Sequence, residues 1–234
     1  MKNSIRNALC AATVCLVAHA NSQGTFQNLN FEQAAAHVAP TLIGGWGDFI
    51  DPALAFPGWN VWNAGGRYPV CFYNDLSIGA PAVCLMGPAF PNGPGYSSLQ
   101  GSYSVLLQYF GVDSGEAPKL SQTGTVPADA KSISFVVLPG QSDIAVSLGG
   151  VSIPLVQAAG GRLAGDVTAF AGSTVQLTFS TTTDKPAGYG DWAYFDDVRF
   201  SSSPAPEPST LALFKLGFVL LSYRVAGLCR RPNR

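Results

Sequence analysis

A short stretch in the second half of the chain alternates apolar with other residues and then turns back on itself. Every second residue from 144 to 148 is apolar, residues 149 and 150 are both glycine, and the alternation resumes over 151–155. A period of two is typical of a β-strand with one buried face. A glycine pair permits the positive φ angles of a two-residue hairpin turn. The stretch therefore predicts a β-hairpin.

The same alternation recurs along most of the chain. It occupies residues 132–138, 173–180 and 191–200, and 26 Gly and 17 Pro separate the apolar segments. A short, irregular helix is expected over residues 31–38. Many short strands with frequent turns are typical of β-sandwiches and barrels. We therefore predict an all-β body over residues 24–201, built as a two-sheet β-sandwich.

The N-terminus has the three regions of a secretory signal peptide in the usual order. Lys2 and Arg6 are followed by the apolar residues 8–17 and then by Ala18-His19-Ala20. A small-x-small site after an apolar region is where signal peptidase cuts. We expect a signal helix over residues 1–20, removed on export; the alternative is a buried N-terminal helix.

The predicted body is acidic. Residues 21–203 carry six basic and thirteen acidic side chains, a net charge of −7. A protein that binds nucleic acid neutralises phosphates with clustered Lys and Arg. The charge pattern therefore argues against a nucleic-acid partner.

The C-terminus pairs an apolar segment with a basic tail. Residues 211–223 are apolar except for Lys215, which is short of the about 20 residues that a full membrane span needs. A segment of this kind suits transient membrane association. A Pro/Ser-rich linker, 202–210, precedes it, and the helix and tail are expected over 211–234.

The linker and tail resemble the PEP-CTERM sorting signal of exported bacterial proteins, through the motif residues Pro206, Glu207, Pro208, Ser209 and Thr210 and the pair Arg230 and Arg231. The resemblance implies recognition by an exosortase, cutting near the motif, and delivery of the body to the envelope or the outside.

The body is similar to the jelly-roll domains of such exported proteins, and in turn to carbohydrate-binding modules of the galactose-binding type. The segments that carry the likeness include TFQNLNFEQA, PGWNVWNAG, LQGSYSVLLQY and YFDDVRFS. The resemblance implies a jelly-roll topology. It also implies a structural Ca²⁺ bound by Glu32, Asp196 and Asp197, since calcium prefers carboxylate and carbonyl oxygens. A bulge at the two aspartates would free a carboxylate to turn; alternatively, both aspartates bond a turn or face water.

Three tryptophans are candidates for contact with a sugar. Aromatic rings stack on sugar faces while polar neighbours bond the hydroxyls. Trp59 and Trp62 lie in a segment bounded by Pro and Gly, and Trp192 follows the sequence GYGD. The alternative for each ring is packing in the core or under a loop.

Cys71 and Cys84 are the cysteines of the predicted body. Export to an oxidising compartment favours a disulfide between them. The alternative is a pair of buried thiols.

Little in the sequence predicts an enzyme. The body has a single histidine, His37, and lacks the nucleophile, zinc and phosphate-loop motifs. Glycoside hydrolysis needs two carboxylates, and no pair is marked out. Two hypotheses follow: an exported module that binds extracellular polysaccharide, or a structural matrix protein without a small ligand. A glycoside-acting enzyme is a distant third.

Overall fold

The computed structural model describes residues 24–35, 41–42, 48–62, 71–74, 81–88, 98–110, 117–139, 143–182 and 190–207. The predicted signal helix and C-terminal hydrophobic helix lie outside these ranges. Within them, no helix is long and apolar enough to cross a bilayer.

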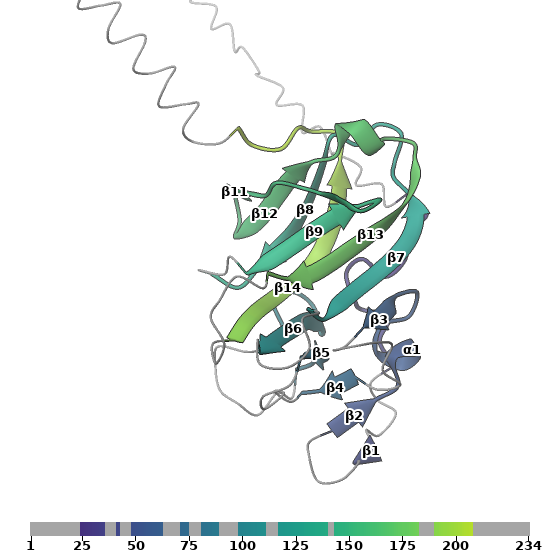
Figure 1. The fold of residues 1–234 in the computed structure, drawn as a ribbon, viewed down its shortest axis with the longest axis vertical. Helices are drawn as coiled ribbons and strands as arrows, with labels where there is room; N and C mark the ends of the chain where they lie inside the picture. The colour runs from purple at the N-terminus through teal and green to yellow at the C-terminus, as the bar shows by residue number, and fades with distance from the viewer. Residues whose placement is uncertain are drawn as a thin grey trace, which may run out of the picture.

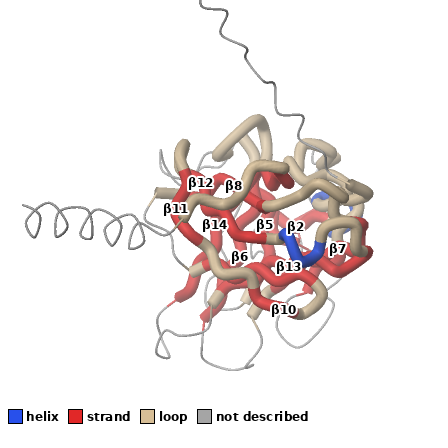
Figure 2. The backbone as a smooth tube through the Cα atoms, turned by 90° about the horizontal axis from the view of Figure 1, so that it is seen from above, coloured by secondary structure: helices blue, strands red, loops and turns tan. Residues whose placement is uncertain are grey.

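The regular secondary structure of the described chain is almost entirely β, with loops and turns between the strands, as Figure 2 shows. Its helical segments are the four-residue α1 (Pro52–Ala55) and the 3-10 turn η1 (Thr168–Phe170). The strands are β1 (Thr41–Leu42), β2 (Asp48–Ile50), β3 (Asn60–Trp62), β4 (Cys71–Tyr73), β5 (Ala82–Met86), β6 (Ser104–Phe110), β7 (Lys119–Thr125), β8 (Ser132–Val137), β9 (Ile144–Leu148), β10 (Val151–Ser152), β11 (Val156–Ala158), β12 (Arg162–Asp166), β13 (Thr174–Thr181) and β14 (Gly190–Ser201).

These strands form two sheets. The larger has the order β1-β2-β4-β5-β6-β14-β8-β12-β11, and the smaller has the order β10-β9-β13-β7-β3. In Figure 1, strands β9, β13 and β7 of the smaller sheet lie in front of β8, β12 and β14 of the larger one. The β4–β5 pair is parallel, whereas the other strand pairs described here are antiparallel. The prediction of a two-sheet β-sandwich is confirmed.

Aromatic side chains from both sheets fill the space between them. Phe179 of β13 stacks on Phe195 of β14, with ring centroids 4.5 Å apart, and the edge of Phe135 from β8 meets Phe179 at 5.3 Å. The N-terminal segment adds Phe26, stacked on Phe200, and Phe31, whose ring meets Phe195 edge to face. All six rings are buried, so this cluster joins the two sheets.

The alternating segments form strands where the sequence predicts them. In β8 the buried apolar residues include Ile133, Phe135 and Val137, as a period of two requires. The predicted hairpin is β9–β10, where Gly149 and Gly150 both have positive φ, the backbone that a two-residue I′ turn needs.

The helix expected over 31–38 is not present in its described part, residues 31–35, which form turns and coil. Phe31 has a φ of 57° and lies buried among other rings, so packing of its side chain decides the local backbone. The short helix lies instead at Pro52–Ala55, where the Asp51 carboxylate accepts a hydrogen bond from the backbone N–H of Ala53 at 2.8 Å. Asp before Pro is a strong start signal for a helix.

Candidate functional site

The outer face of the smaller sheet carries one large exposed aromatic ring, Trp62, at the end of edge strand β3. Its neighbour Val61 is buried, so the alternation of the strand directs Asn60 and Trp62 outward. The Trp62 side chain is 42% exposed. In the pairing register, Trp62 lies opposite Lys119 of β7.

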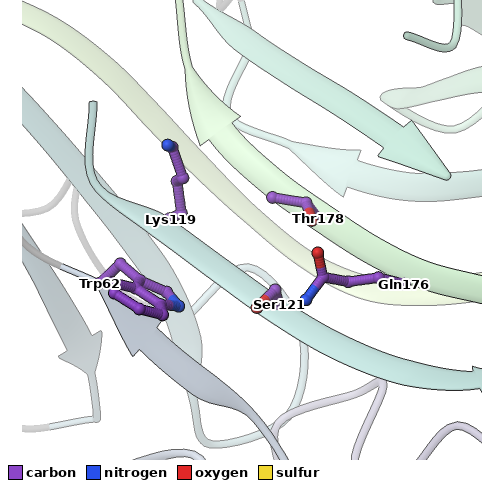
Figure 3. Close-up of a pocket in the computed structure, with 5 residues that line it drawn as sticks. All are labelled: Trp62, Lys119, Ser121, Gln176 and Thr178. Atoms are coloured by element: carbon purple, nitrogen blue, oxygen red, sulfur yellow. The ribbon is translucent and has the colours of Figure 1, made fainter. Parts of the chain in front are cut away.

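Trp62 forms one wall of a shallow pocket of about 270 Å³. Figure 3 shows the ring on one side, Lys119 and Thr178 beyond it, and Ser121 with Gln176 across from it. The pocket is lined by Trp62, Lys119, Ser121, Gln176 and Thr178, from strands β3, β7 and β13. These residues offer an aromatic surface, hydroxyls, an amide and one ammonium group, and none of them is a carboxylate, histidine or cysteine.

Trp59, the second predicted ligand residue, lies in the core and not on this face. Its side chain is 6% exposed, its Nε1–H donates to the carbonyl oxygen of Asn28 at 3.2 Å, and its ring lies 5.6 Å from that of Phe31. Successive side chains of an extended segment point to opposite faces, so Trp59 and Trp62, three positions apart, point in opposite directions. The expectation that both contact a ligand is therefore corrected.

Trp192, the third candidate, lies on the other side of the sandwich. It is half-buried on β14 and packs against a cluster on the outer face of the larger sheet, which consists of Cys84, Met86, Leu106 and Tyr194. Trp62 and Trp192 therefore do not share a surface.

The predicted disulfide is not formed: Cys71 and Cys84 are buried thiols. In the parallel pair β4–β5 it is Phe72, not Cys71, that lies opposite Cys84. Cys71 accordingly packs in the inner core and Cys84 in the outer cluster. The thiols lie on opposite faces of one sheet, a geometry that a disulfide cannot span without backbone movement. Burial raises the pKa of the Cys71 thiol, and nearby Cys84 and Asp51 add to the shift.

Two of the three predicted calcium ligands, Glu32 and Asp196, bind the same loop, residues 98–103. Glu32 Oε1 accepts hydrogen bonds from the backbone N–H groups of Ser102 and Tyr103, at 2.9 and 3.1 Å. Asp196 Oδ2 accepts from Gln100 N–H and from the hydroxyl of Ser104, both at 2.9 Å. The loop therefore presents the positive ends of N–H dipoles to both carboxylates.

The third, Asp197, points to two arginines. Its Oδ2 lies 2.8 Å from both Arg162 Nη1 and Arg199 Nη2. The predicted bulge is present, because the β14–β8 register shifts between Asp196 and Arg199 and Asp197 has a φ of 52°. The bulge turns Asp197 away from its neighbour.

These residues do not fit a bound Ca²⁺. Calcium needs six to eight oxygen ligands, whereas N–H, hydroxyl and guanidinium donors already bond at least one oxygen of each of the three carboxylates. No group of three or more His, Cys, Asp or Glu residues suited to a metal occurs among the described residues. This arrangement gives the calcium site predicted from the sequence no support, and removal of metal is the experiment that decides it.

Of the three predicted calcium ligands, Asp196 has a raised pKa. Its side chain is fully buried. Burial raises its pKa to about 7, although hydrogen bonds from Ser104, Gln100 N–H and Asp197 N–H act in the opposite direction. Asp196 lies at the bulge of β14, on the larger sheet, and does not line the Trp62 pocket.

The fold and the exposed face define a β-sandwich whose hydroxyl-rich surface carries one tryptophan and one lysine. No protein-family model matches the chain, and no curated protein does. Among solved structures, the chain is similar to the Stig cyclase Fisc from Fischerella sp. TAU in complex with an indole compound (14% identity, TM-score 0.45, 78% of this chain and 98% of that one). It is also similar to TmCBM61 in complex with β-1,4-galactotriose (16% identity, TM-score 0.35, 76% and 98%). Similarity this low assigns no function.

Proposed function

We propose that the protein is a binding module that holds a polysaccharide on the outer face of its smaller sheet. The observation that carries the proposal is the exposed ring of Trp62 beside Ser121, Gln176 and Thr178. An indole face covers the C–H groups of a sugar ring, and hydroxyl and amide groups both donate to and accept from its hydroxyls. The pocket combines these two features within one surface.

Binding without catalysis is the second part of the proposal. Glycoside hydrolysis uses two carboxylates on either side of the scissile bond. The residues that line the Trp62 pocket include none. Asp196 and Asp197 serve the bulge and its hydrogen bonds on the larger sheet, so they are not available to a sugar on the smaller one.

Retention on immobilised polysaccharides tests the proposal. The full-length chain, purified in mild detergent, is passed over neutral and acidic glucans, mannans and galactans. We expect retention on at least one, and its loss in Trp62→Ala. Trp192→Ala is the matched control, because it removes the same ring from the opposite side of the sandwich. Equal retention of the wild type and Trp62→Ala would reject this face as the site.

A structural matrix protein without a small ligand is the second candidate. It is favoured by the finding that only one of the three predicted tryptophans lies on the candidate face. The same experiment separates the two, since a structural spacer is retained on none of the polysaccharides.

We further propose that the protein is exported, and that its sandwich has the jelly-roll topology. The N-terminal signal for signal peptidase and the PEP-CTERM-like tail for exosortase support the route, with transient membrane association before cutting. After β14, the described residues 202–207 follow as bends and coil, with Pro206 and Glu207 exposed, which suits access by a protease. Intact mass of the protein recovered from the envelope or medium tests this; a chain with both ends retained would contradict it.

A further inference from the structure

The pairing register of the smaller sheet places uncharged polar residues in one row across all five strands. Asn60 of β3 lies opposite Ser121 of β7, and Ser121 lies opposite Thr178 of β13. Thr178 in turn lies opposite Ser147 of β9, and Ser147 opposite Ser152 of β10. Directly paired residues lie on the same face of a sheet. The five therefore form one continuous line, here called the polar row.

Burial shows that the polar row faces outward. The chain neighbours Val61, Leu120 and Leu177 are buried in the core, as are Val146 and Leu148 on either side of Ser147. Asn60 and Ser152, at the two ends, are exposed, and Ser147 and Thr178 are partly so. Ser121 is buried, with 3% of its surface exposed, and it lies on the floor of the Trp62 pocket.

The length of the polar row suits an extended ligand. Strands in a sheet lie about 4.8 Å apart, so four gaps span about 19 Å. A sugar unit in an extended glycan has a length close to one such gap. A chain laid across the strands then meets one hydroxyl or amide group per unit, and Trp62 adjoins the row at its β3 end.

The charge of this face narrows the ligand class. Of the residues in these five strands, Lys119 alone carries a charge. A glycan with a carboxylate on every unit would place most of its negative charges opposite hydroxyl groups, without a cationic partner, on a protein that is itself acidic. A neutral chain meets groups that both donate and accept along the whole row.

Resting on the proposed function, we propose that the ligand is a linear, neutral glycan that lies across the five strands along the polar row. Trp62 stacks on one of its units at the β3 end. Ser121, Thr178 and Ser147 bond the next units, so the site recognises a segment of about four or five sugars rather than a chain end or a single residue.

Binding of oligosaccharides of one to six units, prepared from neutral β-linked glucan, mannan and galactan, tests this by calorimetry on the full-length chain. For the series that binds, the dissociation constant should fall with each added unit up to four or five and then level off. Ser147→Ala should weaken the pentamer about fivefold, as the loss of one hydrogen bond does, and leave the dimer unchanged. Thr123→Ala, an exposed residue on the same face but outside the row, is the matched control.

Any of three results would overturn the inference while sparing the proposed function. The first is a monomer or dimer that binds as tightly as the pentamer, with binding lost in Trp62→Ala. The second is a Ser147→Ala variant that binds the pentamer as well as Thr123→Ala does. The third is tighter binding to polyuronates than to neutral glycans in low salt. Failure of all oligosaccharides and polysaccharides, with no effect of Trp62→Ala, would reject the proposed function itself.

Discussion

Asp197 Oδ2 lies 2.8 Å from Arg162 Nη1, and this ion pair ties the bulge in β14 to strand β12, two strands away in the larger sheet. Arg162 also donates from Nε to the hydroxyl of Ser134 and from Nη2 to its carbonyl oxygen, at 3.3 and 3.1 Å. Both charged groups are largely shielded from water. The pair thus connects β14, β8 and β12 through one guanidinium group.

Asp197→Asn should destabilise the fold. Asn tolerates the left-handed backbone of Asp197, so the change removes the charge and leaves the bulge. Arg162 and Arg199 then lose their charged partner. Breaking a buried ion pair costs about 3 kcal/mol, and we expect a smaller loss of about 2 kcal/mol here because water can reach Arg199. Urea unfolding measures the difference. Arg199→Ala, which removes the more exposed partner, should cost less than about 1 kcal/mol, and equal losses in both variants would contradict the assignment.

The stability of the fold should fall as the pH rises from about 4 to about 7. The folded pKa of Asp196, about 7, lies above its ordinary value, so the folded state holds a proton that the unfolded state releases. The free energy of unfolding then decreases by at most about 1.4 kcal/mol per pH unit.

Asp196→Asn should flatten this dependence. Thermal melts at pH 5 and pH 8 compare the variant with Asp129→Asn, which makes the same charge change at an exposed position. A wild type that is equally stable at both pH values would reject the raised pKa.

Removal of metal should leave the melting temperature unchanged. The carboxylates of Glu32 and Asp196 are satisfied by N–H and hydroxyl donors, and Asp197 by two arginines. The protein is melted before and after dialysis against EDTA. A drop that Ca²⁺ restores would establish the calcium site predicted from the sequence.

Trp59 and Trp62 should differ sharply on truncation. Trp59→Ala removes a buried ring that packs on Phe31 and Phe179, and the loss of a core aromatic costs about 3 to 5 kcal/mol. Trp62→Ala changes an exposed ring, so we expect less than about 1 kcal/mol. Urea unfolding measures the free energy of unfolding of both variants. A larger loss in Trp62→Ala than in Trp59→Ala would show that Trp62, and not Trp59, is the ring packed in the core.

Cys71 and Cys84 should be recovered as thiols even after the protein has been kept in an oxidising buffer. The protein is denatured without reductant, alkylated with iodoacetamide and digested. We expect both cysteine peptides in alkylated form, because their side chains lie on opposite faces of the sheet. A cross-linked peptide pair would contradict the β4–β5 register.

The class of fold was predictable from local pattern because alternation is a property of the extended backbone itself. The alternation of Ile133, Phe135 and Val137 predicts a strand with one buried face, and this prediction does not depend on which strand pairs with it. The glycine pair at 149 and 150 predicts its turn for the same local reason. The bulge leaves a trace in the local pattern, since the apolar residues Phe195 and Val198 are three positions apart and strict alternation would put them on opposite faces. The structure buries both.

The candidate site depended on pairings that no local pattern contains. Which of Trp59 and Trp62 faces water depends on the strand against which β3 pairs. The separation of Cys71 from Cys84 depends on the parallel register of β4 and β5, and the polar row exists only because four separate pairings bring five distant residues into line. The sequence by itself determined the strands, the turns and the acidic balance of the body. Only the tertiary structure decided the faces, because a side chain's surroundings are set by partners far away in the chain.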